Sequence, residues 1–200
     1  MSPNDTWDVG LAWEPPRLDP DRLPDVLTRL EYQVRRRRLR AADLMRPGLD
    51  RTGVIARLEG VGIQAHPDLI TWWSWRNGDE PGVWGMGHFS YGYYQLSLDE
   101  AIQGWQKFAA DLEWEDDLPL GVEPHYVPFM RSSGRGFLLD TRKREVVNYT
   151  AEYSFEEWHR YANMATVLNS FVINLAMGKD WPLDTPGIHT PDPNYHPETG

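Results

Sequence analysis

The sequence predicts an α+β fold, in which a mainly antiparallel sheet is flanked by helices. Three short segments with strand-like patterns, at 125–129, 136–140 and 146–150, follow one another with connections short enough for hairpins. Segments with apolar residues at helical spacing stand before and after them along the chain. Because consecutive hairpins pair strands antiparallel, we expect a single α+β domain with a helical extension at its N-terminal side.

The first expected helix runs from Asp21 to about Met45. Its apolar residues fall on one stripe, formed by Leu23, Val26, Leu27, Leu30 and Val34. The four arginines Arg35–Arg38 interrupt that stripe, and Pro47-Gly48 is expected to end the helix. The preceding residues, 1–19, contain several prolines and two tryptophans, which predicts an extended lead-in.

Two shorter helices are expected next, followed by a strand-like segment. Asp50 is placed to cap the first helix, and His66-Pro67-Asp68 opens the second. Asn77-Gly78 stands where a left-handed C-terminal cap is expected to close the second helix. From Gly82 to Leu98 the pattern becomes strand-like, with aromatic residues among glycines.

Two capping boxes predict the starts of the remaining helices. Ser97-Leu-Asp-Glu100 begins a helix with a continuous apolar face, and Ser154-Phe-Glu-Glu157 begins a long final helix that Gly178 ends. We expect four large aromatic residues on these helices to pack together in the core: Trp73, Trp105, Phe108 and Trp158. Residues 179–200 are Pro-rich and predict a tail that lies on the surface or is disordered.

Composition excludes several classes of protein. The chain has 200 residues, a net charge of −10 and no cysteine, so disulfide scaffolds, thiol nucleophiles and cysteine–zinc sites are excluded. The acidic surface disfavours nucleic acid and anionic membranes as partners. The first residues have neither a basic nor an apolar stretch, and no apolar run has the length of a membrane span. We therefore expect a cytoplasmic protein without a signal peptide.

The order of the motifs resembles that of one known family. A helix is followed by "HPDLITWWSWRNG", "YYQLSLDEAIQGWQKF" and then "HYVPF…GFLLDT…EVVNYT…SFEEWHRYANM". Over about residues 50–178 this order is similar to the SUKH superfamily, which is related to the yeast cell-wall assembly regulator. Tyr126-Val-Pro128 stands where that family usually has Trp-x-Pro. The resemblance implies an α+β fold without a catalytic centre, used frequently in bacterial immunity proteins that neutralise a toxin.

This resemblance suggests a division of the chain into three parts. Residues 1–48 form an N-terminal extended segment and helix that lie outside the family core. Residues 49–178 form the SUKH-like α+β domain, and residues 179–200 form the Pro-rich tail.

No motif indicates catalysis or a cofactor. None of the six histidines has the spacing of a helical metal site, and they are interpreted as surface or strand residues. The loop Ser132–Gly136 lacks the ending of a phosphate-binding loop and is interpreted as a hairpin turn. There is no Gly-x-Ser-x-Gly elbow. We therefore expect no enzymatic activity, no metal and no cofactor.

The arginine run has two interpretations. Arg35–Arg38 could bind phosphates, or they could dock within the protein onto its acidic body. Because the rest of the chain is acidic, nucleic-acid binding is the less favoured of these interpretations.

The most distinctive charge feature is an acidic segment around a tryptophan. It has five acids in seven positions, and we predict that a partner binds at Asp111, Glu113, Trp114, Glu115, Asp116 and Asp117. The alternative is an ordinary solvated helix end. Clustered acids at a helix C-terminus oppose the helix dipole, however, and a cationic partner would relieve that repulsion. An aromatic residue surrounded by charge is also typical of an interface anchor.

Two functions follow from these observations. The first is an immunity protein that occludes a basic toxin domain, of the kind found in toxin–antitoxin and polymorphic-toxin systems. The second is a regulatory or scaffold module that binds a cellular protein. The sequence leaves the identity of the partner and the oligomeric state open.

Overall fold

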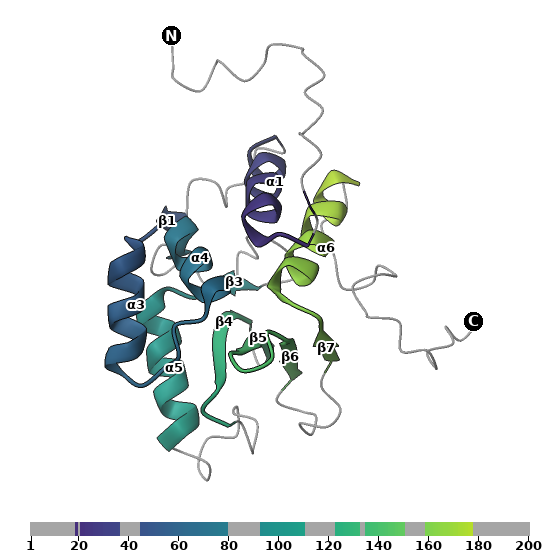
Figure 1. The fold of residues 1–200 in the computed structure, drawn as a ribbon. Helices are drawn as coiled ribbons and strands as arrows, with labels where there is room; N and C mark the ends of the chain where they lie inside the picture. The colour runs from purple at the N-terminus through teal and green to yellow at the C-terminus, as the bar shows by residue number, and fades with distance from the viewer. Residues whose placement is uncertain are drawn as a thin grey trace, which may run out of the picture.

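The computed structural model describes residue 19 and the ranges 21–36, 45–79, 93–110, 123–132, 135–150 and 159–177. Within these ranges the chain forms five helices and two antiparallel sheets. Figure 1 shows the helices arranged above and beside the strands of the larger sheet. The α+β fold class predicted from the sequence is therefore confirmed.

The larger sheet has five strands, which are neighbours in space in the order in which they follow along the chain. They are β3 (Tyr94–Gln95), β4 (Tyr126–Ser132), β5 (Arg135–Asp140), β6 (Val146–Thr150) and β7 (His159–Tyr161). Every neighbouring pair is antiparallel. Strands β4, β5 and β6 overlap the three predicted strands, and consecutive strands pair antiparallel, as expected for hairpins. The predicted turn Ser132–Gly136 is too long, because β4 continues to Ser132 and β5 already begins at Arg135.

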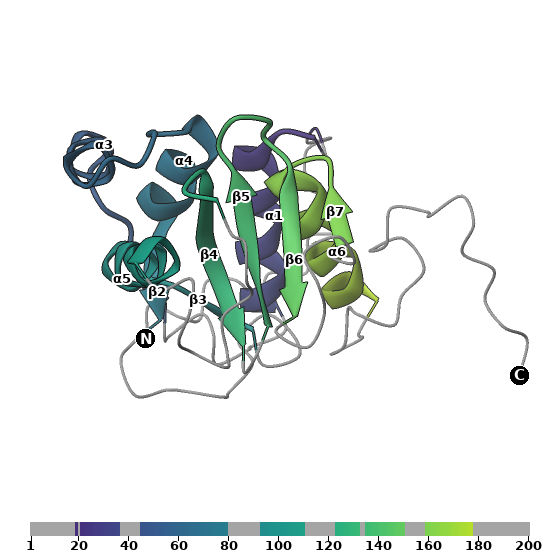
Figure 2. The same cartoon turned by 90° about the horizontal axis from the view of Figure 1, so that it is seen from below.

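One face of this sheet packs against two helices, α1 (Leu23–Arg36) and α6 (Met164–Ala176). The two helices contact each other and lie behind the strands in Figure 2. Phe171 of α6 meets Phe137 of β5 edge-on, with ring centroids 6.1 Å apart. The five residues of the predicted stripe on α1 are each at most 2% exposed. Helix α1 therefore shares one hydrophobic core with the sheet.

The two shorter helices begin where the sequence predicts. Helix α3 (Arg51–Gly60) is capped by Asp50, whose carboxylate accepts a hydrogen bond from a first-turn backbone N–H at 3.0 Å. Helix α4 (Pro67–Trp75) is capped by His66, whose Nδ1 accepts from a first-turn N–H at 3.2 Å. Both caps satisfy backbone donors that have no partner inside the helix.

Helix α5 (Leu98–Ala110) begins with the predicted capping box. The backbone N–H of Glu100 donates to Ser97 Oγ at 3.2 Å, and the N–H of Ser97 donates to Glu100 Oε2 at 2.7 Å. A third donor, the N–H of Leu98, is satisfied by Asn77 Oδ1 at 3.0 Å. Asn77 thus joins the start of α5 to the segment that follows α4.

Only two of the four residues of the predicted aromatic cluster have described side chains. Trp73 of α4 is fully buried and donates its Nε1–H to the carbonyl of Leu96 at 3.0 Å. Trp105 of α5 is only partly buried, at the edge of the core. The side chain of Phe108 and all of Trp158 lie outside the description.

The second sheet was not predicted from the sequence. Its strands are β1 (Met45–Pro47) and β2 (Arg76–Asp79), so two predictions of helix ends are wrong. Met45 begins a strand instead of ending a helix, and Asn77-Gly78 lies in β2 instead of capping α4. Gly78 does have a positive φ of 79°, and a Cβ there would in addition clash with the backbone of Ser97, so both the conformation and the close approach require glycine.

The predicted long final helix is also wrong at its start. The proposed capping box at 154–157 lies outside the described residues, but residues 159–161 form β7. Tyr161 pairs with Val146 and is 2% exposed, so pairing with β6 places its ring in the core. Helix α6 begins only after this strand. Its cap is Asn163, whose Oδ1 accepts from the N–H of Thr166 at 2.9 Å.

The strand-like pattern predicted from Gly82 to Leu98 falls mostly on residues that the structure does not describe. Its described part contains β3, which pairs with β4. None of the helices in the described ranges is long and apolar enough to cross a membrane.

Candidate functional site

The six residues predicted to bind a partner lie outside the described residues. The structure does place both ends of the segment that contains them. The segment follows Ala110, the last residue of α5, and precedes Glu123, which stands just before β4. Trp105 connects these two sides, because its Nε1–H donates to the carbonyl of Pro124 at 2.7 Å. The segment therefore leaves and rejoins the described fold beside the C-terminal half of α5.

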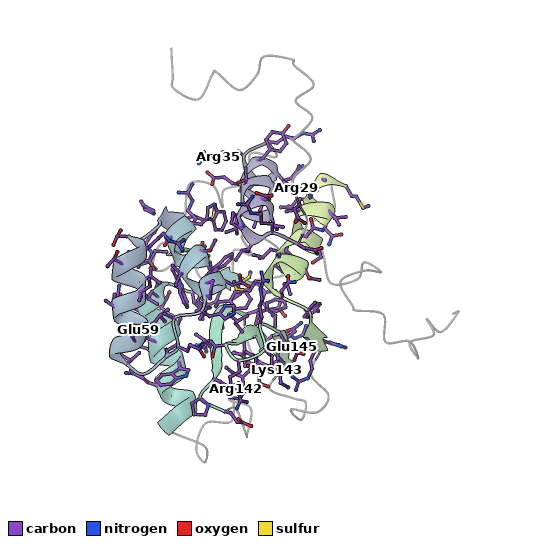
Figure 3. All side chains as sticks on the ribbon, in the orientation of Figure 1. Arg29, Arg35, Glu59, Arg142, Lys143 and Glu145 are labelled. Atoms are coloured by element: carbon purple, nitrogen blue, oxygen red, sulfur yellow. The ribbon has the colours of Figure 1, made fainter. Side chains whose placement is uncertain are left out.

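A group of ionisable side chains lies next to the second of these ends. Glu123, His125, Asp140 and Arg142 are referred to here as the His125 cluster. His125 Nδ1 is 3.2 Å from Glu123 Oε2, and His125 Nε2 is 3.6 Å from Asp140 Oδ2. Arg142 Nη2 lies 2.5 Å from His125 Nε2 and donates to Glu123 Oε2 at 3.1 Å. In Figure 3, Arg142 and the neighbouring Lys143 project at the lower end of the molecule.

Asp140 organises the turn that carries Arg142. Its side chain is fully buried, and its Oδ1 accepts from the backbone N–H groups of Arg142 at 2.9 Å and Lys143 at 3.2 Å. The hydroxyl of Thr141 donates to the carbonyl of His125 at 3.1 Å. An aspartate that accepts from N–H groups two and three residues later is typical of tight turns. This local chemistry brings the end of β5 against the start of β4.

Arg144 connects the same turn to helix α4. Its guanidinium donates to both oxygens of Asp68, at 2.9 and 3.3 Å, and this hydrogen bonding raises the pKa of Arg144. The backbone of Arg144 is left-handed, with a φ of 65°, which costs a residue with a Cβ roughly 1–2 kcal/mol. The nearly buried Asp68 offsets that cost, because two charge-assisted hydrogen bonds hold the arginine in place.

The electrostatics of the cluster favour a neutral His125. Burial lowers its pKa below the ordinary value of 6.5. The carboxylates of Asp140 and Glu123 oppose this effect, whereas Arg142 and Lys143 lower the pKa of His125 further. The contact with Arg142 agrees with this direction, because a guanidinium only donates hydrogen bonds and Nε2 must accept.

Part of the arginine run makes contacts within the protein. Arg35 donates to Glu31 at 2.8 Å, and the same carboxylate accepts from Trp75 Nε1 at 3.0 Å and from Arg76 at 2.7 Å. Burial alone would raise the pKa of Glu31, but these hydrogen bonds and the nearby charges outweigh it and lower the pKa. Arg35 thus pairs within its own helix, and it is Glu31 that connects α1 to α4 and β2, so docking of the run onto the acidic body stays a prediction. Arg37-Arg38 lie outside the described residues.

The chemistry of the His125 cluster is that of charge recognition and proton binding. Within the described ranges, no three His, Cys, Asp or Glu side chains are placed to hold a metal ion. Sequence reasoning missed the cluster, because it treated His125 as an ordinary strand histidine. The available signal was Asp140, an acid at the end of an apolar strand and immediately before a basic turn.

No protein-family model matches the chain, and no curated protein matches it. The resemblance to the SUKH superfamily therefore stays a prediction that rests on the order of the motifs. The observed fold class agrees with what that resemblance implies. One fold class serves many functions, however, so this agreement does not assign a function by itself.

Proposed function

We propose that this protein is a non-catalytic protein-binding module of the immunity type. It binds a cognate toxin domain with a basic surface, in the bacterial cytoplasm, and neutralises it by occlusion. The proposal includes no cofactor, nucleic acid or membrane. It is supported by the SUKH-like order of motifs, the net charge of −10 and the acidic segment around Trp114.

The observation that carries the proposal is the way in which the acidic segment is attached. Its flanks are held by helix α5 and strand β4, and Trp105 ties them together through Pro124. A segment with fixed ends loses less conformational entropy on binding than a free tail. Such an attachment favours specific recognition, in which the acids attract a basic surface and Trp114 supplies an apolar anchor.

The test uses the purified product of the gene adjacent to this one as the candidate partner. Neutralising three acids together, with Glu115→Gln, Asp116→Asn and Asp117→Asn, is expected to slow association and to flatten its dependence on salt. Trp114→Ala is expected to act mainly by speeding dissociation. Both effects are measured by surface plasmon resonance over a series of salt concentrations.

The matched control removes the same charge elsewhere on the surface. Asp19→Asn, Asp21→Asn and Glu59→Gln also neutralise three acids, and all three positions are exposed. This control is expected to change the association rate less than the first triple variant does. Equal effects of the two triple variants would mean that only the net charge matters, and that the acidic segment is not the interface.

Expression of the partner in cells distinguishes the second function. A regulatory or scaffold module would bind a cellular protein that causes no growth arrest when it is expressed alone. A toxin arrests growth when it is expressed alone, and co-expression of its immunity protein restores growth.

A further inference from the structure

The two ring nitrogens of His125 face partners of different kinds. Nδ1 lies 3.2 Å from a carboxylate oxygen of Glu123, which only accepts, so Nδ1 carries the hydrogen. Nε2 lies 2.5 Å from the guanidinium of Arg142, which only donates, so Nε2 carries the lone pair. These contacts identify His125 as a neutral imidazole with its proton on Nδ1.

Asp140 offers Nε2 a second partner that the neutral ring cannot use. Asp140 Oδ2 is 3.6 Å from Nε2, too far for a hydrogen bond, and it accepts none from the residues that the structure describes. The side chain of Asp140 is fully buried, whereas its other oxygen already accepts from two backbone N–H groups. A buried carboxylate oxygen without a donor costs free energy. A hydrogen on Nε2, which lies less than 1 Å beyond hydrogen-bonding distance, would therefore stabilise Asp140 Oδ2.

We propose that His125 is a protonation switch that exchanges Arg142 for Asp140 as the hydrogen-bond partner of Nε2. A proton taken from solvent occupies the Nε2 lone pair, so the ring can no longer accept from Arg142. The new Nε2–H donates to Asp140 Oδ2 instead. Arg142, whose side chain is 56% exposed, moves away from the cationic ring toward solvent and keeps Glu123 as its ion-pair partner.

The charged groups around the ring decide when the switch operates. Glu123 faces it from the segment before β4, Asp140 from the end of β5, and Arg142 and Lys143 from the turn between β5 and β6. Since burial and the nearby cations lower the pKa of His125, the midpoint of the exchange lies below pH 6.5. The backbone of the turn stays in place, because Asp140 Oδ1 and not Oδ2 holds it.

This switch goes beyond the proposed function, which requires no titratable group. It adds one positive charge and releases one arginine at the end of the molecule where the acidic segment is attached. The two proposals can fail independently, because the switch is tested on the isolated protein without any partner.

The first test is an NMR titration of the His125 ring in the intact protein. Arg142→Met removes the donor to Nε2 and is expected to raise the pKa of His125 by about one unit, a tenfold gain in proton affinity. The control is Lys143→Met, which removes the neighbouring exposed cation that makes no contact with the ring. Its effect is expected to be several times smaller, and equal shifts in the two variants would overturn the direct contact.

A second measurement needs no variant. Nitrogen NMR of the imidazole distinguishes the two neutral tautomers, and we expect the proton on Nδ1 above neutral pH. A proton on Nε2 in that range would overturn the proposal. Asp140→Asn, which keeps an oxygen for the turn, is expected to lower the pKa of His125, because the protonated ring loses its charged acceptor. An unchanged pKa in this folded variant would remove Asp140 from the switch.

Discussion

Asp79 is a buried carboxyl group at the end of β2, and its ionisation couples folding to pH. The residue is 8% exposed, and its Oδ2 accepts from the backbone N–H of Gln95 at 3.2 Å. Burial raises the pKa of Asp79 to about 7. The hydrogen bond from Gln95 and the charge of Arg46 lower it, while the nearby Glu100 adds to the increase.

The sign of the effect follows from proton binding. In the unfolded chain the carboxyl group has its ordinary pKa of 3.8, so the folded state binds the proton more tightly between about pH 4 and pH 7. The free energy of unfolding therefore falls as the pH rises through this window, and the loss is complete above about pH 7. The difference between 3.8 and about 7 corresponds to roughly 4 kcal/mol.

Asp79→Asn tests this reasoning, because asparagine keeps an acceptor for the N–H of Gln95 and cannot ionise. The stability of the variant relative to the parent is expected to rise by roughly 4 kcal/mol between about pH 4 and pH 8. The measurement is urea unfolding followed by tryptophan fluorescence at both pH values. The exposed Asp21→Asn serves as the control and should give a flat difference. If the stability of Asp79→Asn relative to the parent were also the same at both pH values, Asp79 would not be a buried carboxyl group that stays protonated up to about pH 7.

Two further predictions concern the core and the contacts of Glu31. Trp72→Ala is expected to lower the free energy of unfolding by about 3–5 kcal/mol, since Trp72 is fully buried with its ring centroid 5.7 Å from that of Phe129. Trp105→Ala should cost clearly less, because Trp105 is only partly buried, and equal losses in urea unfolding would place it in the core. The lowered pKa of Glu31 stabilises the fold above about pH 4.5, so the advantage of the parent over Glu31→Gln should shrink as the pH falls below that value. Thermal melting at several pH values measures this difference, and a constant difference would contradict it.

The elements that the sequence predicts correctly have local causes. The stripe on α1 and the short apolar runs of β4 to β6 are patterns within single segments. The starts of α3, α4 and α5 depend on cap residues such as Asp50 and Ser97, which bond to backbone groups two or three residues away. Such contacts can be read from a short window of sequence.

The missed strands have tertiary causes. Strand β2 reads Arg-Asn-Gly-Asp and has no apolar residue, so it carries no strand pattern of its own. Distant residues hold it in place, since Gln95 donates to the carbonyl of Arg76 at 2.6 Å and Asn77 caps α5. Strand β7 has three residues, of which only Tyr161 is buried, and the helical pattern around it conceals the strand.

The candidate site has one part that is visible in the sequence and one part that depends on tertiary structure. The acidic segment is visible in the sequence because its charges are contiguous, although it lies outside the described residues. The His125 cluster is not visible, because it joins a residue before β4 to the far end of β5. Only the antiparallel register, which pairs Tyr126 with Asp140, brings these groups together.

Growth rescue on co-expression is the measurement that tests the proposed function most directly. The product of the adjacent gene is expressed alone, then with this protein, and then with the variant that combines Trp114→Ala with the three neutralised acids 115–117. The account predicts growth arrest in the first case, restored growth in the second, and arrest again in the third while the variant stays folded. Arrest that this protein does not relieve, or a neighbouring product that causes no arrest, would contradict the immunity function.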